Sequence, residues 1–210
     1  MTALAVPIAR FPEAALLLEF WLGDALTLGW PSANRGDLWF GGGAALDQQI
    51  TQTFGTLVRE AVHGGLVPWE NDAHDRLALV LLLDQFTRNV FRGQAAAFSG
   101  DARACALARD ALARGWDREL SLAGQVFLAM PLMHAESLQV QEQSVAYFTA
   151  LLTRSRKQYG DAVLGNLTSA REHHALIARF GRFPHRNAAL GRPSTLQEAA
   201  YLQTGQRFGQ

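Results

Sequence analysis

The sequence has almost no cysteine and no surplus of either charge. Its single cysteine, Cys105, excludes an intrachain disulfide and lies in the helix-like stretch ACALARDAL, where a small buried side chain is typical. The 210 residues include 19 basic and 19 acidic ones, so the formal net charge is zero. A neutral chain argues against bulk electrostatic binding to nucleic acid or to an anionic membrane. Together these features predict a cytoplasmic protein with neither as a partner.

Long hydrophobic runs and the common enzyme signatures are also missing. The longest apolar run, from Leu77 to Leu83, is far shorter than the roughly 20 residues of a membrane-spanning helix. The first residues, MTALAVPIARF, carry no basic residue ahead of a short apolar run, so we expect no signal peptide. Nucleophile elbows, Walker loops, dinucleotide-binding glycine motifs and cysteine pairs for zinc are absent from the sequence.

Most of the sequence reads as amphipathic helix. Apolar residues recur at helical spacing, and no segment alternates like a β-strand. Ser121 and Thr195 are expected helix N-caps, Gly181 is an expected helix end, and Pro131 is expected to kink or end its helix. We therefore predict an all-α fold of about seven to nine helices, packed as antiparallel neighbours in one domain over residues 1–210.

Two short motifs place Arg-Asn pairs beside aromatic residues, and the first is DQFTRN at residues 84–89. Asp84 and Arg88 are four apart and share one face of a strongly apolar helix, where an arginine must be paired. One interpretation is an internal Asp84–Arg88 pair, with Asn89 as the left-handed cap that ends the helix. The other is that Gln85 and Arg88 face a pocket.

The second motif, RFPHRN, opens a loop that runs from Arg182 to Thr195. Arg182, His185, Arg186 and Asn187 surround a glycine-containing loop that leads into the N-terminus of a short helix. Guanidinium groups and free backbone N–H groups form anion sites, and His185 can exchange a proton there. The last third of the chain is also basic, whereas the rest is acidic. The alternative is that the two parts pack together and neutralise each other.

The remaining histidines do not predict a metal site. His134 and Glu136 are only two residues apart, so on a helix they point in nearly opposite directions and cannot chelate one ion. His173 shares a face with apolar residues, which is typical of a hydrogen-bonded core histidine, although a proton-transfer role stays open. We expect no metal and no cofactor.

Longer stretches that contain these motifs resemble one bacterial family. They are EFWLGDA, LWFGGGAALDQQITQTFG, LLLDQFTRNVFRG, FSGDARA, PLMHAES, HHALIARFGRFPHRNAALGRPST and EAAYLQTGQRF. In this order, over nearly the whole chain, they resemble the domain-of-unknown-function family 924. The resemblance implies an all-helical, tetratricopeptide-like fold, a right-handed array of helix pairs, without a settled activity. Thr87 stands where the family usually has proline.

The polar residues that are typical of this family are spread over four segments of the chain. This spread suggests a pocket, since a helix scaffold needs mainly its apolar packing positions. The first hypothesis is a pocket that binds a small anionic molecule, with or without acting on it. The residues expected to bind the ligand are Trp39, Asp84, Gln85, Arg88, Asn89, Arg182, Arg186 and Asn187. Those expected to transfer protons, or to orient the groups that do, are His134, Glu136, His173 and His185.

Two alternatives stay open. The protein can be a helical-array scaffold that binds a peptide or a partner helix in its groove, or the Arg-Asn motifs can be purely structural. The pocket hypothesis requires that the two motifs meet in space. As a loop residue, Arg186 is expected to be less needed for packing than an arginine in a helix. The residues indicate no oligomeric state.

Overall fold

A computed structural model describes residues 9–155 and 157–205, and these residues form an all-α fold without a β-strand. The α-helices are α1 (Pro12–Leu22), α2 (Ala25–Leu28), α3 (Ala44–Val62), α4 (Ala73–Leu81), α5 (Thr87–Val90), α6 (Asp101–Arg114), α7 (Leu122–Met133), α8 (Leu138–Arg154), α9 (Gly160–Phe180) and α10 (Leu196–Thr204). The tighter and wider helical segments are η1 (Asp37–Gly41), η2 (Val67–Asn71), η3 (Leu82–Phe86), η4 (Ala95–Phe98), η5 (Trp116–Glu119), η6 (Lys157–Tyr159) and η7 (Pro184–Arg186). The predicted all-α class is confirmed.

Local signals set most helix ends. The Ser121 side chain accepts a hydrogen bond from the first turn of α7, and Thr195 forms a capping box at the start of α10. Gly181 ends α9 in the left-handed conformation, with φ of 70°. Pro131 does not end its helix, because α7 continues to Met133. Only one intrahelical hydrogen bond is lost at a proline so near the C-terminus, and α7 is held by its buried neighbours.

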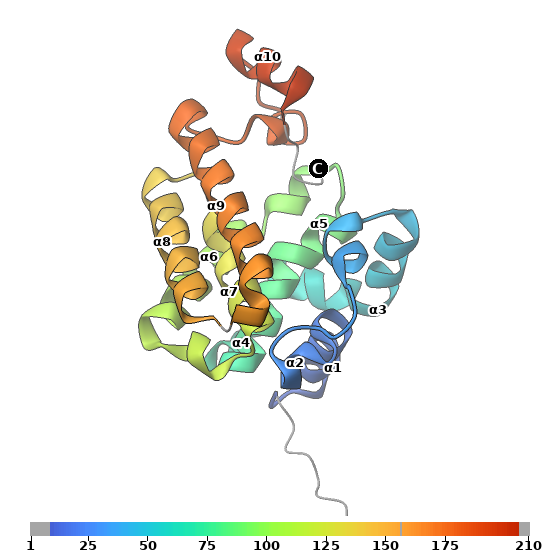
Figure 1. Ribbon diagram of the computed structural model, residues 1–210. Coiled ribbons are helices and arrows are strands. Elements are labelled where there is room, and N and C mark those ends of the chain that lie inside the picture. Colours follow the sequence, from blue (N-terminus) through green and yellow to red (C-terminus); the bar gives the residue numbers. More distant parts are fainter. Residues whose placement is uncertain (1–8, 156, 206–210) are drawn as a thin grey trace, which may run out of the picture.

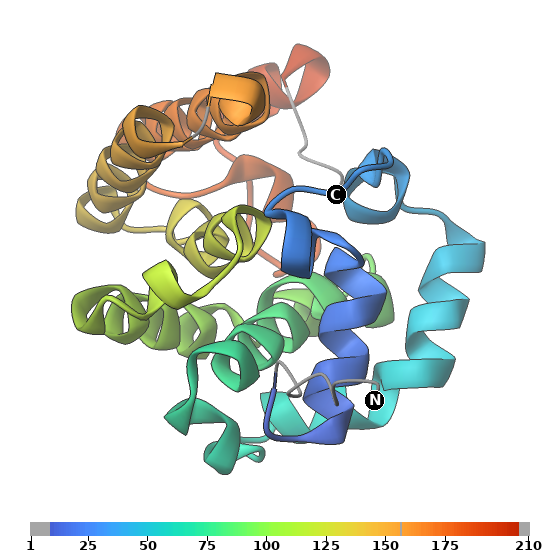
Figure 2. The ribbon, with the colours of Figure 1, turned by 60° about the horizontal axis from the view of Figure 1, so that its bottom comes forward.

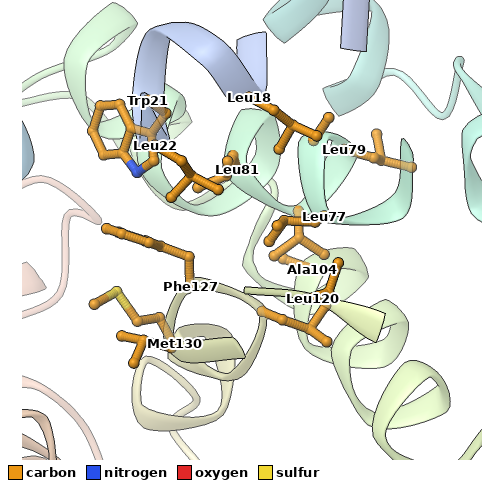
Figure 3. Close-up of a cluster of buried hydrophobic side chains, with 14 of the residues drawn as sticks. Leu18, Trp21, Leu22, Leu77, Leu79, Leu81, Ala104, Leu120, Phe127 and Met130 are labelled. Atoms are coloured by element: carbon orange, nitrogen blue, oxygen red, sulfur yellow. The ribbon is translucent and has the colours of Figure 1, made fainter. Parts of the chain in front are cut away.

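The apolar helix α4 lies in the centre of the fold. Figure 3 shows Leu77, Leu79 and Leu81 radiating from α4 toward side chains of the surrounding helices. The leucines are at most 1% exposed, so α4 is buried on all sides. Helices α8 and α9 pack side by side and cover α7, and α10 lies at the far end of α9 (Figures 1 and 2). None of the helices described is long and apolar enough to cross a membrane.

The central helix changes its winding where the first Arg-Asn motif begins. After α4 the backbone passes through the π-helical turn η3 and returns to α-helix in α5. Asp84 and Gln85 lie within the π-turn, a feature that is frequent at functional sites. Asn89 is not a left-handed cap. It lies inside α5, and its side-chain amide donates a hydrogen bond of 2.8 Å to Asp47 on α3.

A close backbone contact fixes where α6 begins. Gly100 precedes α6, and a Cβ atom at this position would lie 2.3 Å from the carbonyl oxygen of Leu83 in the π-turn. Glycine therefore allows the two segments to touch, which places the first residue of α6, Asp101, next to the Arg-Asn motif.

This contact predicts a large effect of a single methyl group. Gly100→Ala should lower the free energy of unfolding by about 1–3 kcal/mol, because backbone atoms must move apart. Gly165→Ala on α9 is the matched control: no atom lies within 4 Å of the added methyl group. It should raise stability by up to about 1 kcal/mol through helix propensity. Urea unfolding of both variants checks the prediction, and equal stability of the two would contradict it.

Candidate functional site

The structure contains a cavity of about 720 Å³. Four parts of the chain surround it: the loop before η1 together with η1, the π-turn together with α5, helix α7, and the first half of α9. Ligand pockets generally have volumes of this order. Nine of the predicted site residues line it: Trp39, Asp84, Gln85, Arg88, Asn89, His134, His173, His185 and Arg186. Residues far apart in the sequence therefore converge on one place.

A histidine and a buried carboxylate form a dyad in the wall of the cavity. His134 Nδ1 lies 2.7 Å from Asp84 Oδ1, and the Asp84 side chain is 1% exposed. Gln85 donates a hydrogen bond of 2.6 Å to the other carboxylate oxygen. Burial raises the pKa of Asp84, but His134 and then Arg88 outweigh it, so the pKa lies below its usual value. Asp84 is therefore ionised and orients the imidazole, which leaves Nε2 for a ligand.

The two Arg-Asn motifs meet at a shared carboxylate, as the pocket hypothesis requires. Arg88 donates to one oxygen of Asp101 over 2.6 Å, and Arg186 donates to the other over 2.9 Å. Both guanidinium groups also lie over the ring of Phe98, at 4.6 and 4.7 Å from its centroid. The motifs therefore share one ion-pair network.

Arg186 is more deeply built into the fold than its loop position suggests. Its side chain is only 8% exposed, and its guanidinium lies over the rings of Phe98 and Phe183. Burial lowers its pKa from the usual value, and Asp101 opposes that shift. Its buried Nε has no hydrogen-bond acceptor among the residues described. Arg186 was expected to be less needed for packing than an arginine in a helix, but η7 turns this side chain inward onto Asp101.

Three predicted site residues lie outside the cavity. Glu136 binds both guanidinium nitrogens of Arg192, at 2.6 and 2.9 Å. Arg182 pairs in the same two-pronged way with Glu198, at 2.6 and 2.8 Å.

Asn187 donates to Ser194, and the start of α10 is satisfied by its own capping box. The loop before α10 is therefore neutralised internally. The anion site expected there stays a prediction, and its arginines Arg182 and Arg192 already have carboxylate partners.

Two of the three histidines at the cavity are neutral. Burial lowers the pKa of His173 and of His185 to about 3. His173 also donates from Nδ1 to the carbonyl oxygen of Ser169 over 2.7 Å, as a core histidine does. His134, held by Asp84, is therefore the histidine best placed for proton transfer. No group of three potential metal ligands occurs in the described part of the chain.

The cavity also has lining residues that the sequence motifs did not indicate. Trp30, Arg35 and Phe127 line it, and so does Gly165 on α9. None of them lies in an Arg-Asn motif. One sequence signal could have indicated Phe127. It lies seven residues before His134, so on a helix both side chains face the same side and can line one cavity.

Fold and site together define an all-helical protein with a polar cavity at the meeting point of two Arg-Asn motifs. The chain belongs to the family described as "Bacterial protein of unknown function (DUF924)", whose profile matches residues 17–206. It is similar to a solved protein of unknown function from Agrobacterium tumefaciens, with 35% sequence identity and a TM-score of 0.75. The match covers 91% of this chain and 97% of that one. No curated protein matches it.

The shared carboxylate predicts a strong dependence of stability on one charge. Asp101→Asn should lower the free energy of unfolding by about 3–5 kcal/mol, because Arg186 loses its carboxylate partner and Arg88 keeps only Asp84, 3.9 Å away. The control is Arg114→Gln, which breaks an ion pair whose side chains are 54% and 45% exposed. Such exposed pairs contribute at most about 1 kcal/mol. Similar urea midpoints for the two variants would show that Asp101 is not the centre of the network.

The neutral histidines predict how stability changes with pH. The pKa of His173 and of His185 is about 3 when folded, against about 6.5 in an unfolded chain. Between these values the unfolded chain binds more protons, so stability is full above pH about 6.5 and falls as the pH falls. Each histidine contributes a slope of up to about 1.4 kcal/mol per pH unit. His173→Gln should remove the contribution of this histidine to the slope of stability against pH. Urea unfolding from pH 7 to 4 measures the slope, and an unchanged slope in the variant would refute the assignment of a neutral His173.

Proposed function

We propose that the protein binds a small organic anion in this cavity and that His134 exchanges a proton with it. The observation that carries the proposal is the position of the Asp84–His134 dyad and of the Arg88–Asp101–Arg186 network on one cavity. A dyad of this kind supplies a general acid or base, and the arginines supply donors in fixed positions.

The charges around the cavity favour a ligand with a single negative charge. Arg35, Arg88, Arg92 and Arg186 line the cavity. Asp84 also lines it, while Asp47 pairs with Arg92 and Asp101 with the two motif arginines. Asp24 is a fourth carboxylate and acts on Arg35 at longer range, so the cavity has no large surplus of positive charge.

Arg35 is held mainly by backbone carbonyls, and the carboxylate of Asp24 attracts it from a longer distance. It donates to the backbone carbonyls of Phe20 and Trp21 at the end of α1, and it makes no ion pair with a residue described here. These carbonyls belong to the negative end of a helix and neutralise the guanidinium only in part.

A peptide-binding scaffold has less support, because polar residues of both motifs, among them Arg88 and Arg186, line one cavity. We further propose, on the sequence and on the family resemblance, that the protein works in the cytoplasm and that its helices form a tetratricopeptide-like right-handed array.

A cavity-filling variant tests the binding proposal. Gly165 lines the cavity on α9, and no atom lies within 4 Å of a Cβ atom placed there. Gly165→Leu should therefore occupy the cavity without disturbing the helix. The control is Gly160→Leu, at a position on the same helix that has equally open surroundings but is not part of the cavity lining.

Native mass spectrometry of the purified proteins is the measurement. The parent protein and Gly160→Leu should retain a small acid, and Gly165→Leu should lose it while its circular dichroism stays helical. His134→Gln should retain the acid, because the arginines that bind it are unchanged, but should lose any reaction that needs proton exchange with the imidazole. The proposal fails if no acid co-purifies with the parent and none from an acid library raises its melting temperature.

A further inference from the structure

We infer that the anion is a carboxylate carried by a flat aromatic ring system, an inference that rests on the anion-binding function proposed above. The charged residues of the cavity, called its floor here, are Asp84, Arg88 and Arg186, and they select the acid group. A separate observation, the arrangement of the aromatic side chains that line the same cavity, selects the rest of the molecule.

The aromatic wall is a rigid corner. Trp39 Nε1 donates to the carbonyl oxygen of Trp21 over 2.9 Å, which fixes the indole ring. The Trp39 ring stands nearly perpendicular to Trp30, at 81° and 5.7 Å, and to Phe127, at 72° and 4.9 Å. A third flat ring placed in such a corner lies face-on to one ring and edge-on to another, the two arrangements that aromatic pairs favour.

One face of α7 connects the aromatic side of the cavity with its charged side. Phe127, Met130 and His134 are spaced three and four residues apart, and all three line the cavity. The helical rise separates the first from the last by about 10 Å. Met130 lies between them, where its thioether suits the edge of an aromatic ring. A ligand that touches both ends must be elongated, which favours a fused two-ring acid over a one-ring acid.

The acid group is a carboxylate and not a phosphate. The arginines at the cavity already have the carboxylates Asp47, Asp101 and Asp24 as partners or neighbours, so little positive charge is left, which suits a monoanion better than a phosphate dianion. No lysine lines the cavity. The helix N-terminus next to Gly42 already has Asp47 in its first turn, so it is not free for a phosphate. Guanidinium forks match the two oxygens of a carboxylate.

Isothermal titration with matched probes tests this inference. The probes are 2-naphthoate, its neutral amide 2-naphthamide, the saturated decahydro-2-naphthoate, and inorganic phosphate. The parent protein and Gly160→Leu should bind 2-naphthoate, and Gly165→Leu should not. The amide should bind about ten- to a hundredfold more weakly, because it loses a charge-assisted contact. The saturated acid should bind about two- to tenfold more weakly. Trp30→Leu should cause the same loss for 2-naphthoate and none for the saturated acid.

The outcomes separate the inference from the function on which it rests. Equal binding of the saturated acid would overturn the aromatic part, and equal binding of the amide would overturn the carboxylate. If phosphate binds and 2-naphthoate does not, the ligand is a different anion, so the inference fails while the proposed function stands. If no probe binds and no acid co-purifies with the protein, both fail.

Discussion

The site depends on the contact that Arg88 and Arg186 make with one carboxylate, Asp101. This contact joins the end of the central helix, the start of α6 and the loop before α10, which come from different parts of the sequence. A buried guanidinium is stable only when it is paired, so neither motif can leave the site without a large cost. The floor of the cavity is therefore held by charge neutralisation, whereas the helices around it are held by apolar packing.

Two kinds of side chain, aromatic and charged, line the cavity. Trp30 and Trp39 together with Phe127 of α7 supply aromatic rings with fixed orientations, and arginines from several segments supply the charges. Two neutral histidines, His173 and His185, add polar surface without adding charge. His134 pairs with the carboxylate of Asp84, which orients its imidazole toward the same cavity that Arg88 and Arg186 line.

The sequence predicts local features such as helix caps. It does not predict which carboxylate pairs with which arginine. The caps at Ser121 and Thr195 follow from short-range chemistry, and the meeting of the motifs follows from the need to pair buried arginines. Asp101 was missed because nothing in its neighbourhood distinguishes it from the other acidic residues. The ion pair of Arg182 was missed because its partner, Glu198, also serves as a helix-capping residue, and sequence reasoning assigned it only that role.

The π-turn in the central helix has a consequence for how this helix presents its residues. A turn closed by i→i+5 hydrogen bonds contains one residue more than an α-helical turn, which rotates everything after it by about 100° relative to a regular helix. The apolar residues of α4 and the polar residues of α5 therefore follow two patterns that are out of phase. Deleting one residue between Leu82 and Phe86 would restore a uniform helix, but it would swing Arg88 and Asn89 away from Asp101 and Asp47. The irregular turn thus lets one continuous helix serve as the centre of the core at one end and as a cavity wall at the other.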